Sequence, residues 1–419
     1  MTVPMLGLVD TAVIGHLDAP VYLAAVAVGA LIFTFLYWTF IFLRMGTGGL
    51  TAQAFGAGDA DEIRAALARP MLVVGGLAAL MLALQVPIAG AAFAIVETGA
   101  EVEALAREYF FIRIWGAPAT LANFVLLGWF LGMQNSRAML AQMVCVNAVN
   151  IALDLIFVVV LEMGVAGVAA ASAIAEYAGL ALGLVIAARI LKATGGRWER
   201  ARILDPRGLG HTVAVNRDIF MRTVLLIAAF AYFTMQGARL GEVVLAANAV
   251  LMNFFTIYSH AVDSFAHAVE AMVGRALGAR SREGFVRAVA ACAVWALGVS
   301  LLVTVIFAVA GGPIVRALTD LTEVRAVAGE HLGWLIALPI VTVAAFVLDG
   351  VFVGATRARE MRNSMIVCFA LYMPLAWYLP TVWGNHGLWA ALLGLMVLRG
   401  TTLGWLFARI ERRGGFVKS

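Results

Sequence analysis

Charged residues are scarce in this chain: Asp, Glu, Lys and Arg make up 13% of its 419 residues, about half of the share in soluble globular domains. Hydrophobic residues account for 63%, and the mean hydropathy is +0.95. This composition excludes a soluble domain. The net charge of +4 is better explained by topology signals in the loops than by nucleic-acid binding, so we expect no nucleic-acid partner.

Cysteine is also rare. Cys145, Cys292 and Cys368 lie far apart, each inside an apolar run. Such a set provides neither a disulfide framework nor the spacing of a metal site. We therefore expect packing roles for them, and neither a cofactor nor a resident metal in the protein.

Long apolar runs, in contrast, recur from one end of the chain to the other. Each has roughly the 20 residues that a helix needs to cross a ~30 Å hydrocarbon layer. The sequence therefore predicts an all-α polytopic membrane protein with twelve transmembrane helices, at 1–16, 21–45, 67–93, 110–133, 138–161, 165–189, 218–238, 243–273, 286–311, 331–355, 363–383 and 387–408.

Basic residues predict the orientation of these helices. Most of the 29 Lys and Arg residues fall in alternate connections, above all in the 190–215 loop and in the C-terminal tail. The positive-inside rule places these connections and both termini in the cytoplasm. We expect a multi-pass protein of the cytoplasmic (inner) membrane that acts as a monomer within the lipid bilayer.

The chain also contains an internal repeat at an offset of 222 positions. FVLLGWFLGMQNSRAM at 124–139 aligns with FVLDGVFVGATRAREM at 346–361, and AFGAGDADE at 54–62 aligns with ALGARSREG at 276–284. A tandem duplication of six helices predicts two pseudo-symmetric lobes with a cavity between them. We expect an N-lobe at 1–192, a cytoplasmic linker at 193–215 and a C-lobe at 216–419. The repeat also makes the first run look short, so we expect its helix to be truncated at the N-terminus.

Six carboxylates lie inside the predicted spans: Asp10, Asp154, Glu176, Asp263, Glu270 and Asp349. Each costs roughly 2.5–3.5 kcal/mol at the centre of a bilayer, so such residues usually face a polar interior. Burial disfavours the charged form, which enables a carboxylate to exchange a proton for a cation. The alternative is a structural carboxylate that is hydrogen-bonded to a neighbouring helix.

The first bundle holds the strongest candidate site. Asn147, Asn150 and Asp154 are spaced three and four residues apart, which places them on one helix face. Asp10 lies in VDTAVIGHL, and Ser172 follows the small-residue run GVAGVAAA, where helices approach closely. The oxygens of Asp10, Asn150, Asp154 and Ser172 suit H⁺, Na⁺ or an organic cation.

The second bundle contains a polar stripe formed by His260, Asp263, His267 and Glu270. A lining of a polar cavity or a proton relay is the favoured interpretation, interhelical hydrogen bonding is the next, and a metal site is the least favoured. Asp349, which replaces Leu127 of the other repeat, joins Asn147 and Glu176 as a further candidate for the cavity or a relay. Arg222 and Arg399 lie near span ends, where we expect their side chains to snorkel.

These motifs, in this order, resemble the multidrug and toxic compound extrusion (MATE) transporters, most closely their DinF-like branch. The resemblance covers almost the whole chain. It rests on VDTAVIGHL, LTAQAFGAGD at 50–59, GWFLGMQNSR at 128–137, NIALD at 150–154, GVAGVAAAS before and at Ser172, AEY at 175–177 and LDGVFVGATRAREMRNS at 348–364. It implies a coupling-cation site at Asp10, Asn150 and Asp154, with Ser172 where many relatives have Thr. It also implies that Asp349 stands where some relatives of another branch use an acid.

The resulting prediction is a cation-coupled antiporter that exports amphipathic or cationic xenobiotics by alternating access, with H⁺ favoured over Na⁺ as the coupling ion. One alternative is a lipid-linked oligosaccharide flippase of the same wider superfamily, which would need a basic central cavity. A membrane-embedded enzyme is the other, but the chain lacks the His-Glu-x-x-His and Gly-x-Ser-x-Gly motifs.

Overall fold

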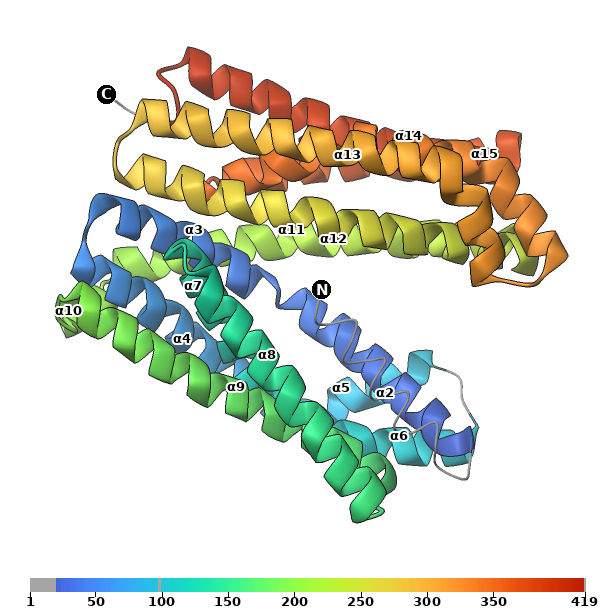
Figure 1. Ribbon diagram of the computed structural model, residues 1–419, viewed down its shortest axis with the longest axis horizontal. Helices are drawn as coiled ribbons and strands as arrows, with labels where there is room; N and C mark the ends of the chain where they lie inside the picture. Colours follow the sequence, from blue (N-terminus) through green and yellow to red (C-terminus); the bar gives the residue numbers. More distant parts are fainter. Residues whose placement is uncertain (1–19, 97–98, 418–419) are drawn as a thin grey trace. The chain divides into compact units, whose positions relative to one another are not determined.

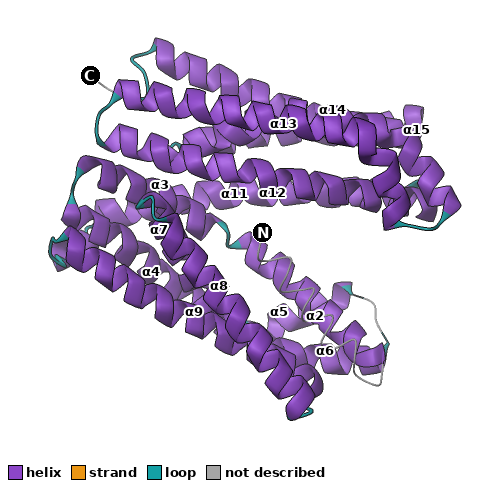
Figure 2. Ribbon diagram, viewed as in Figure 1, coloured by secondary structure: helices purple, strands orange, loops and turns teal. Residues whose placement is uncertain are grey.

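The computed structural model describes residues 20–96 and 99–417, and these residues form helices joined by short turns, with no β-strand among them (Figures 1 and 2). The N-terminal helices are α2 (Pro20–Thr39), α3 (Phe42–Ala57), α4 (Ala60–Ala83), α5 (Gln85–Ile95), α6 (Ala100–Arg113), η1 (Ile114–Gly116), α7 (Ala117–Gly132), α8 (Ser136–Asp154), η2 (Leu155–Val160) and α9 (Gly164–Thr194). They are followed by α10 (Arg200–Ile203), α11 (Pro206–Arg239), α12 (Glu242–Gly278), α13 (Arg282–Leu318), α14 (Thr322–Gly354) and α15 (Ala358–Arg412).

Among the described residues, ten helical segments are long and apolar enough to cross a membrane. One of them, α15, consists of two helices that meet at Gly384, whose φ of 55° interrupts the helical backbone. The expected spans 363–383 and 387–408 lie on its two arms. The expected span 1–16 lies outside the described residues. Many large hydrophobic side chains stay exposed, including Trp295 and Val309, as lipid-facing surfaces require. The prediction of an all-α polytopic membrane protein is confirmed.

The chain divides into two compact units. One comprises Met1–Phe55 with Asp59–Val213, and the other comprises Gly56–Gly58 with Ala214–Ser419. The segment that we expected to be a linker, 193–215, is partly helical: it contains α10 and the first turns of α11, which begins at Pro206. Proline is favoured at the first position of a helix because that position needs no hydrogen-bonded N–H.

Helix starts follow the internal repeat. Asp59 caps α4 by accepting a 3.0 Å hydrogen bond from the Glu62 backbone N–H. Ser281, which aligns with Asp59 at the offset of 222, caps α13 by accepting a 3.1 Å bond from the Gly284 N–H. Side-chain oxygens at this position satisfy an N–H group that the first turn of a helix leaves without a partner. The two lobes therefore begin corresponding helices by the same device.

Close helix packing follows the repeat as well. In the N-terminal unit, a Cβ atom at Gly128 or Gly132 of α7 would overlap backbone atoms of α3, at Arg44 and Gly48 respectively. In the C-terminal unit, a Cβ atom at the aligned Gly350 or Gly354 of α14 would overlap the carbonyl oxygens of Ala266 and Glu270 on α12. The α12 residues are themselves 222 positions after the α3 residues. Each lobe therefore uses a pair of glycines, one helical turn apart, to bring two backbones into contact.

Candidate functional site

The candidate site in the N-terminal unit lies at the end of α8. Asp154 is the last residue of α8 and Asn150 lies one helical turn before it, and immediately after Asp154 the helix widens into the π-helix η2. Short π-helical segments within α-helices occur frequently at functional sites, because they change the direction of the side chains around them. The carboxylate of Asp154 therefore stands at a point where the helical repeat changes.

Two of the four predicted coupling residues are in contact here, and a third, Asp154, is buried one helical turn further along α8. Asn150 on α8 donates a 3.3 Å hydrogen bond from Nδ2 to Oγ of Ser172 on α9. Asn150 and Asp154 are 0% exposed and Ser172 is 3% exposed. The carbonyl oxygen Oδ1 of Asn150 has no hydrogen-bond partner within the described part of the chain. The fourth residue, Asp10, lies outside the described residues.

Glycines of α9 allow this close approach to α8. A Cβ atom at Gly179 would overlap Val146, and one at Gly183 would lie 2.9 Å from Nε2 of Gln142. The small residues therefore place one face of α9 directly against the face of α8 that carries Gln142, Asn150 and Asp154. Close helix approach was expected from the sequence at the small-residue run before Ser172, whereas Gly179 and Gly183 lie after that run and were not singled out.

A second buried network lies on the same faces. Gln142 of α8 donates a 2.8 Å hydrogen bond to Oδ1 of Asn123 on α7. Asn123 in turn donates a 2.7 Å bond to Oε2 of Glu176 and a 2.9 Å bond to its backbone carbonyl oxygen. Glu176 is one helical turn after Ser172, and it is held by Asn123 of α7, which is in turn held by Gln142 of α8. Asn147, also a candidate, is half-buried on α8.

The C-terminal unit contains a buried charge triad. Oδ2 of Asp349 on α14 accepts hydrogen bonds from Nη2 of Arg222 on α11 and, at 2.6 Å, from Nη2 of Arg399 on α15. Asp349 is 7% and Arg399 is 4% exposed. The expectation that Arg399 snorkels to the membrane surface is wrong: the ion pair with Asp349 holds its guanidinium inside the lobe. Arg222 is bound in the same way.

The predicted stripe on α12 changes in burial along its length. His260 is exposed, with Nδ1 2.6 Å from the carbonyl oxygen of Thr256, whereas Glu270 is 2% exposed. Asp263 and His267 lie between them and are half-buried. Ten residues of helix span about 15 Å, so the ends of the stripe cannot bind one ligand together. Within the described residues, no three His, Cys, Asp or Glu side chains are arranged to hold a metal ion.

Several residues of these networks were not predicted from the sequence as functional: Asn123, Gln142, Arg222 and Arg399. A signal was present for the two arginines, since a guanidinium inside an apolar span needs an acidic partner. Asn123 and Gln142 gave a weaker signal, because amides in membrane helices form hydrogen bonds between helices in many proteins.

Comparisons with known proteins agree with this fold. The MatE family model matches residues 1–156 and 219–378. DNA damage-inducible protein F of Escherichia coli (strain K12) is 45% identical over 414 residues, which cover 99% of this chain and 90% of that protein. A probable multidrug resistance protein NorM of Caulobacter vibrioides is 27% identical over 436 residues, covering 97% of this chain and 87% of NorM.

A solved structure described as MATE in the bent conformation superposes with a TM-score of 0.87 at 20% sequence identity, and covers 98% of this chain and 92% of that one. The two-lobe helical fold is therefore shared. The match to the family extends over most of the chain, and the resemblance to the DinF-like branch is confirmed by the Escherichia coli relative. The chain belongs to the MATE family and is a multi-pass membrane transporter, not an enzyme.

Proposed function

We propose that this transporter is a cation-coupled antiporter that exports amphipathic or cationic compounds by alternating access, with H⁺ as the favoured coupling ion and Na⁺ as the alternative. The observation that carries the proposal is the buried hydrogen bond between Asn150 and Ser172, with the buried carboxylate of Asp154 one helical turn after Asn150. With Asp10, they make up the coupling site of the proposal.

The chemistry of these groups suits proton exchange. A protonated carboxyl group at Asp154 has an O–H donor, and Oδ1 of Asn150, one helical turn away, is an acceptor without a partner among the described residues. An ionised Asp154 would instead attract a cation, with the Asn150 carbonyl and the Ser172 hydroxyl as further oxygen ligands. One site can therefore hold a proton or a metal cation, but not both.

Coupling to transport then follows from differential affinity. Protonation of Asp154 removes the negative charge that holds a cationic substrate, so the proton and the substrate compete. A ligand shifts a two-state equilibrium only as far as its affinities for the two states differ. The proposed cycle needs the protonated site to favour release of the substrate on the outer side of the membrane.

The C-terminal unit supports the choice of the N-terminal site. Asp349 faces two guanidinium groups, so the triad carries one net positive charge. A cation that approached Asp349 would have to displace Arg222 and Arg399. The acid in this lobe is therefore a poor first choice for the coupling site, although a role as a relay stays a prediction.

The proposal includes the location of the protein. The basic residues of the 190–215 loop and of the tail support cytoplasmic termini, and we propose that the spans lie in the inner membrane. We propose that the protein acts as a monomer. A lipid-linked oligosaccharide flippase is not favoured, since relatives such as NorM carry the description of multidrug resistance proteins.

The experiment that tests the function is transport by proteoliposomes under an imposed pH gradient or Na⁺ gradient. We expect a fluorescent organic cation to exchange against protons, with uptake that collapses when the pH gradient is removed. Exchange that requires Na⁺ and is indifferent to the pH gradient would replace H⁺ by Na⁺ as the coupling ion.

A control separates the coupling site from surface charge. Glu101→Gln neutralises an exposed acid of the same lobe and should leave the exchange unchanged, whereas Asp154→Asn should abolish it. Equal exchange by both variants would refute the proposed site, and no exchange of any cation by the wild type under either gradient would refute the function.

A further inference from the structure

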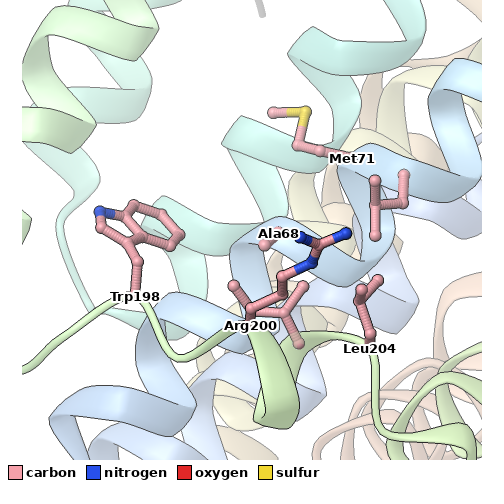
Figure 3. A pocket seen from close by; sticks show the side chains of 7 residues that line it. Ala68, Met71, Trp198, Arg200 and Leu204 are labelled. Atoms are coloured by element: carbon pink, nitrogen blue, oxygen red, sulfur yellow. The ribbon is translucent and has the colours of Figure 1, made fainter.

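A pocket that the transport proposal does not use lies beside α4, where the residues that follow α9 fold back against it (Figure 3). It has a volume of about 450 Å³. Figure 3 shows Ala68 and Met71 on α4, and Trp198, Arg200 and Leu204 on the segment around α10, arranged about this pocket. Leu72 and Ile203 complete the lining. The walls are apolar, and one side chain among them is charged.

Interactions between α4 and the 193–205 segment build this pocket. Arg64 of α4 donates hydrogen bonds to the carbonyl oxygens of Leu191, at 2.7 Å, and Gly195, at 2.7 and 3.0 Å. Its guanidinium also lies 5.2 Å from the centroid of the Trp198 ring, a cation–π distance. Arg69 donates a 2.9 Å bond to the carbonyl oxygen of Arg202. The segment that carries Trp198 and Arg200 is therefore fixed to the span.

The acids at this end of the unit are already engaged with other groups. Asp59 pairs with Arg202 at 2.7 Å, and Glu62 pairs with Arg69 at 2.5 Å. Asp61 accepts a 2.6 Å hydrogen bond from the backbone N–H of Arg197. Glu199 pairs with Arg202 at 3.9 Å, and Asp205 accepts a 2.8 Å bond from the Gly208 N–H. Arg200 forms no ion pair with any residue in the described ranges, and its side chain is exposed at the pocket. The pocket therefore offers a positive charge that the protein itself does not neutralise.

The surroundings of the pocket define the chemistry of its occupant. The α4 wall belongs to a predicted membrane span, and Leu72 is 51% exposed, so this wall faces acyl chains. Trp198 is 54% exposed, and tryptophan prefers the level of the lipid headgroups. Basic pockets beside transmembrane helices at the cytoplasmic surface bind anionic lipid headgroups. An apolar wall beneath an unpaired arginine matches a molecule with an acyl chain and a phosphate.

We propose that this pocket is a binding site for an anionic phospholipid. The acyl chain packs on Met71, Leu72 and Leu204, and the phosphate group accepts hydrogen bonds from Arg200. With the cytoplasmic orientation proposed above, the lipid comes from the inner leaflet. Binding of the lipid does not depend on the transported compound or on the coupling ion, so this proposal can fail or hold independently of the transport function.

The test measures lipid binding directly on the full-length protein in a neutral detergent. The probes are phosphatidylglycerol and phosphatidylcholine with brominated chains, which quench nearby tryptophan fluorescence. Subtracting the signal of a Trp198→Phe variant isolates the response of Trp198. We expect saturable quenching by phosphatidylglycerol, with an affinity at least about fivefold above that for phosphatidylcholine, because one arginine near a membrane surface contributes about that factor.

Variants assign the effect to the pocket. Arg200→Gln should weaken phosphatidylglycerol binding by about fivefold and phosphatidylcholine binding by less, because the choline cation already compensates the charge of its phosphate. Arg207→Gln removes a neighbouring exposed charge outside the pocket and should leave both affinities unchanged. Equal affinity for the two lipids, an unaffected Arg200→Gln variant, or equal weakening by both substitutions would each overturn the proposal. Displacement of the lipid by inorganic phosphate alone would also overturn it, since the site would then bind an anion and not a lipid.

Discussion

Arg399 donates a 2.6 Å hydrogen bond from Nη2 to Oδ2 of Asp349, and both side chains are buried in the interior of the C-terminal unit. Arg222 donates to the same carboxylate oxygen. One acid thus compensates two guanidinium groups in a region that water scarcely reaches. A buried charge without its partner is far more costly than an exposed one, so the stability of this lobe depends on Asp349.

Replacement of Asp349 by Asn should therefore destabilise the protein strongly. Removal of one partner of a buried ion pair typically costs about 3–5 kcal/mol, because the opposite charge stays buried. We expect a large fall in the melting temperature of the detergent-solubilised protein. Asp320→Asn removes the acid of an exposed pair with Arg325 in the same unit and should cause no measurable change. A melting temperature for Asp349→Asn equal to that of the control variant would show that the triad is not structural.

The sequence predicted this acid but not its partners, and the reason is physical. Arg222 and Arg399 are 127 and 50 residues away from Asp349 and lie on two other helices. A single helix pattern indicates which residues share a face, but it does not indicate which helix that face meets. Asn150 and Ser172, which were assigned to one site from the sequence, lie on consecutive membrane helices, so their contact needs no choice among distant helices.

The repeat was the most informative signal in the sequence. Its offset of 222 correctly paired Gly128 with Gly350 and Asp59 with Ser281, and the structure gives each pair the same local role. Departures from the repeat were harder to interpret. The presence of Asp349 where the first repeat has Leu127 indicated a feature particular to the second lobe. It did not indicate that this feature is an ion-pair triad with Arg222 and Arg399.

The hydroxyl group of Ser172 gives a graded test of the coupling site. Ser172→Ala leaves Nδ2 of the buried Asn150 without its partner, which should cost about 1–3 kcal/mol of stability. It also removes one proposed oxygen ligand of the coupling ion, so the affinity for that ion should fall. Ser172→Thr keeps the hydroxyl and should retain activity. The measurement is the pH dependence of substrate exchange in proteoliposomes. Equal losses in both variants would indicate that the packing of α9, and not the hydroxyl, controls transport.

The paired glycines predict where a single methyl group is not tolerated. Gly354→Ala places a Cβ atom against the Glu270 carbonyl oxygen and should separate α12 from α14, at a cost of about 1–3 kcal/mol or more. Gly298→Ala, within α13, adds a methyl group where nothing lies within 4 Å. It should be neutral or stabilising by up to about 1 kcal/mol. Thermal unfolding of the two variants compares them directly, and equal melting temperatures would contradict close packing at Gly354.

Asp59 predicts a local pH dependence at the basic end of the N-terminal unit. The hydrogen bond from the Glu62 backbone N–H, followed by the bond and charge of Arg202, lowers the pKa of Asp59 below its ordinary value, and the bond to Asp59 raises the pKa of Arg202. Because the pKa of Asp59 is lower in the folded state than in the unfolded state, its ionised carboxylate stabilises the folded protein at pH values above the ordinary pKa of Asp. This stabilisation is lost as the pH falls through the lowered value. We therefore expect acid to release α10 from α4.

Two substitutions separate the cap from the ion pair. Asp59→Ala removes both and should cost about 1 kcal/mol through the loss of the cap alone. Asp59→Asn keeps a good cap but removes the titration, so its melting temperature should fall less than that of the wild type between about pH 7 and pH 3. Ser281→Ala removes the corresponding cap of α13, which has no ionisable group, and should lower the melting temperature equally at both pH values. A wild-type pH profile that Asp59→Asn reproduces in full would assign the acid sensitivity to carboxylates elsewhere in the protein.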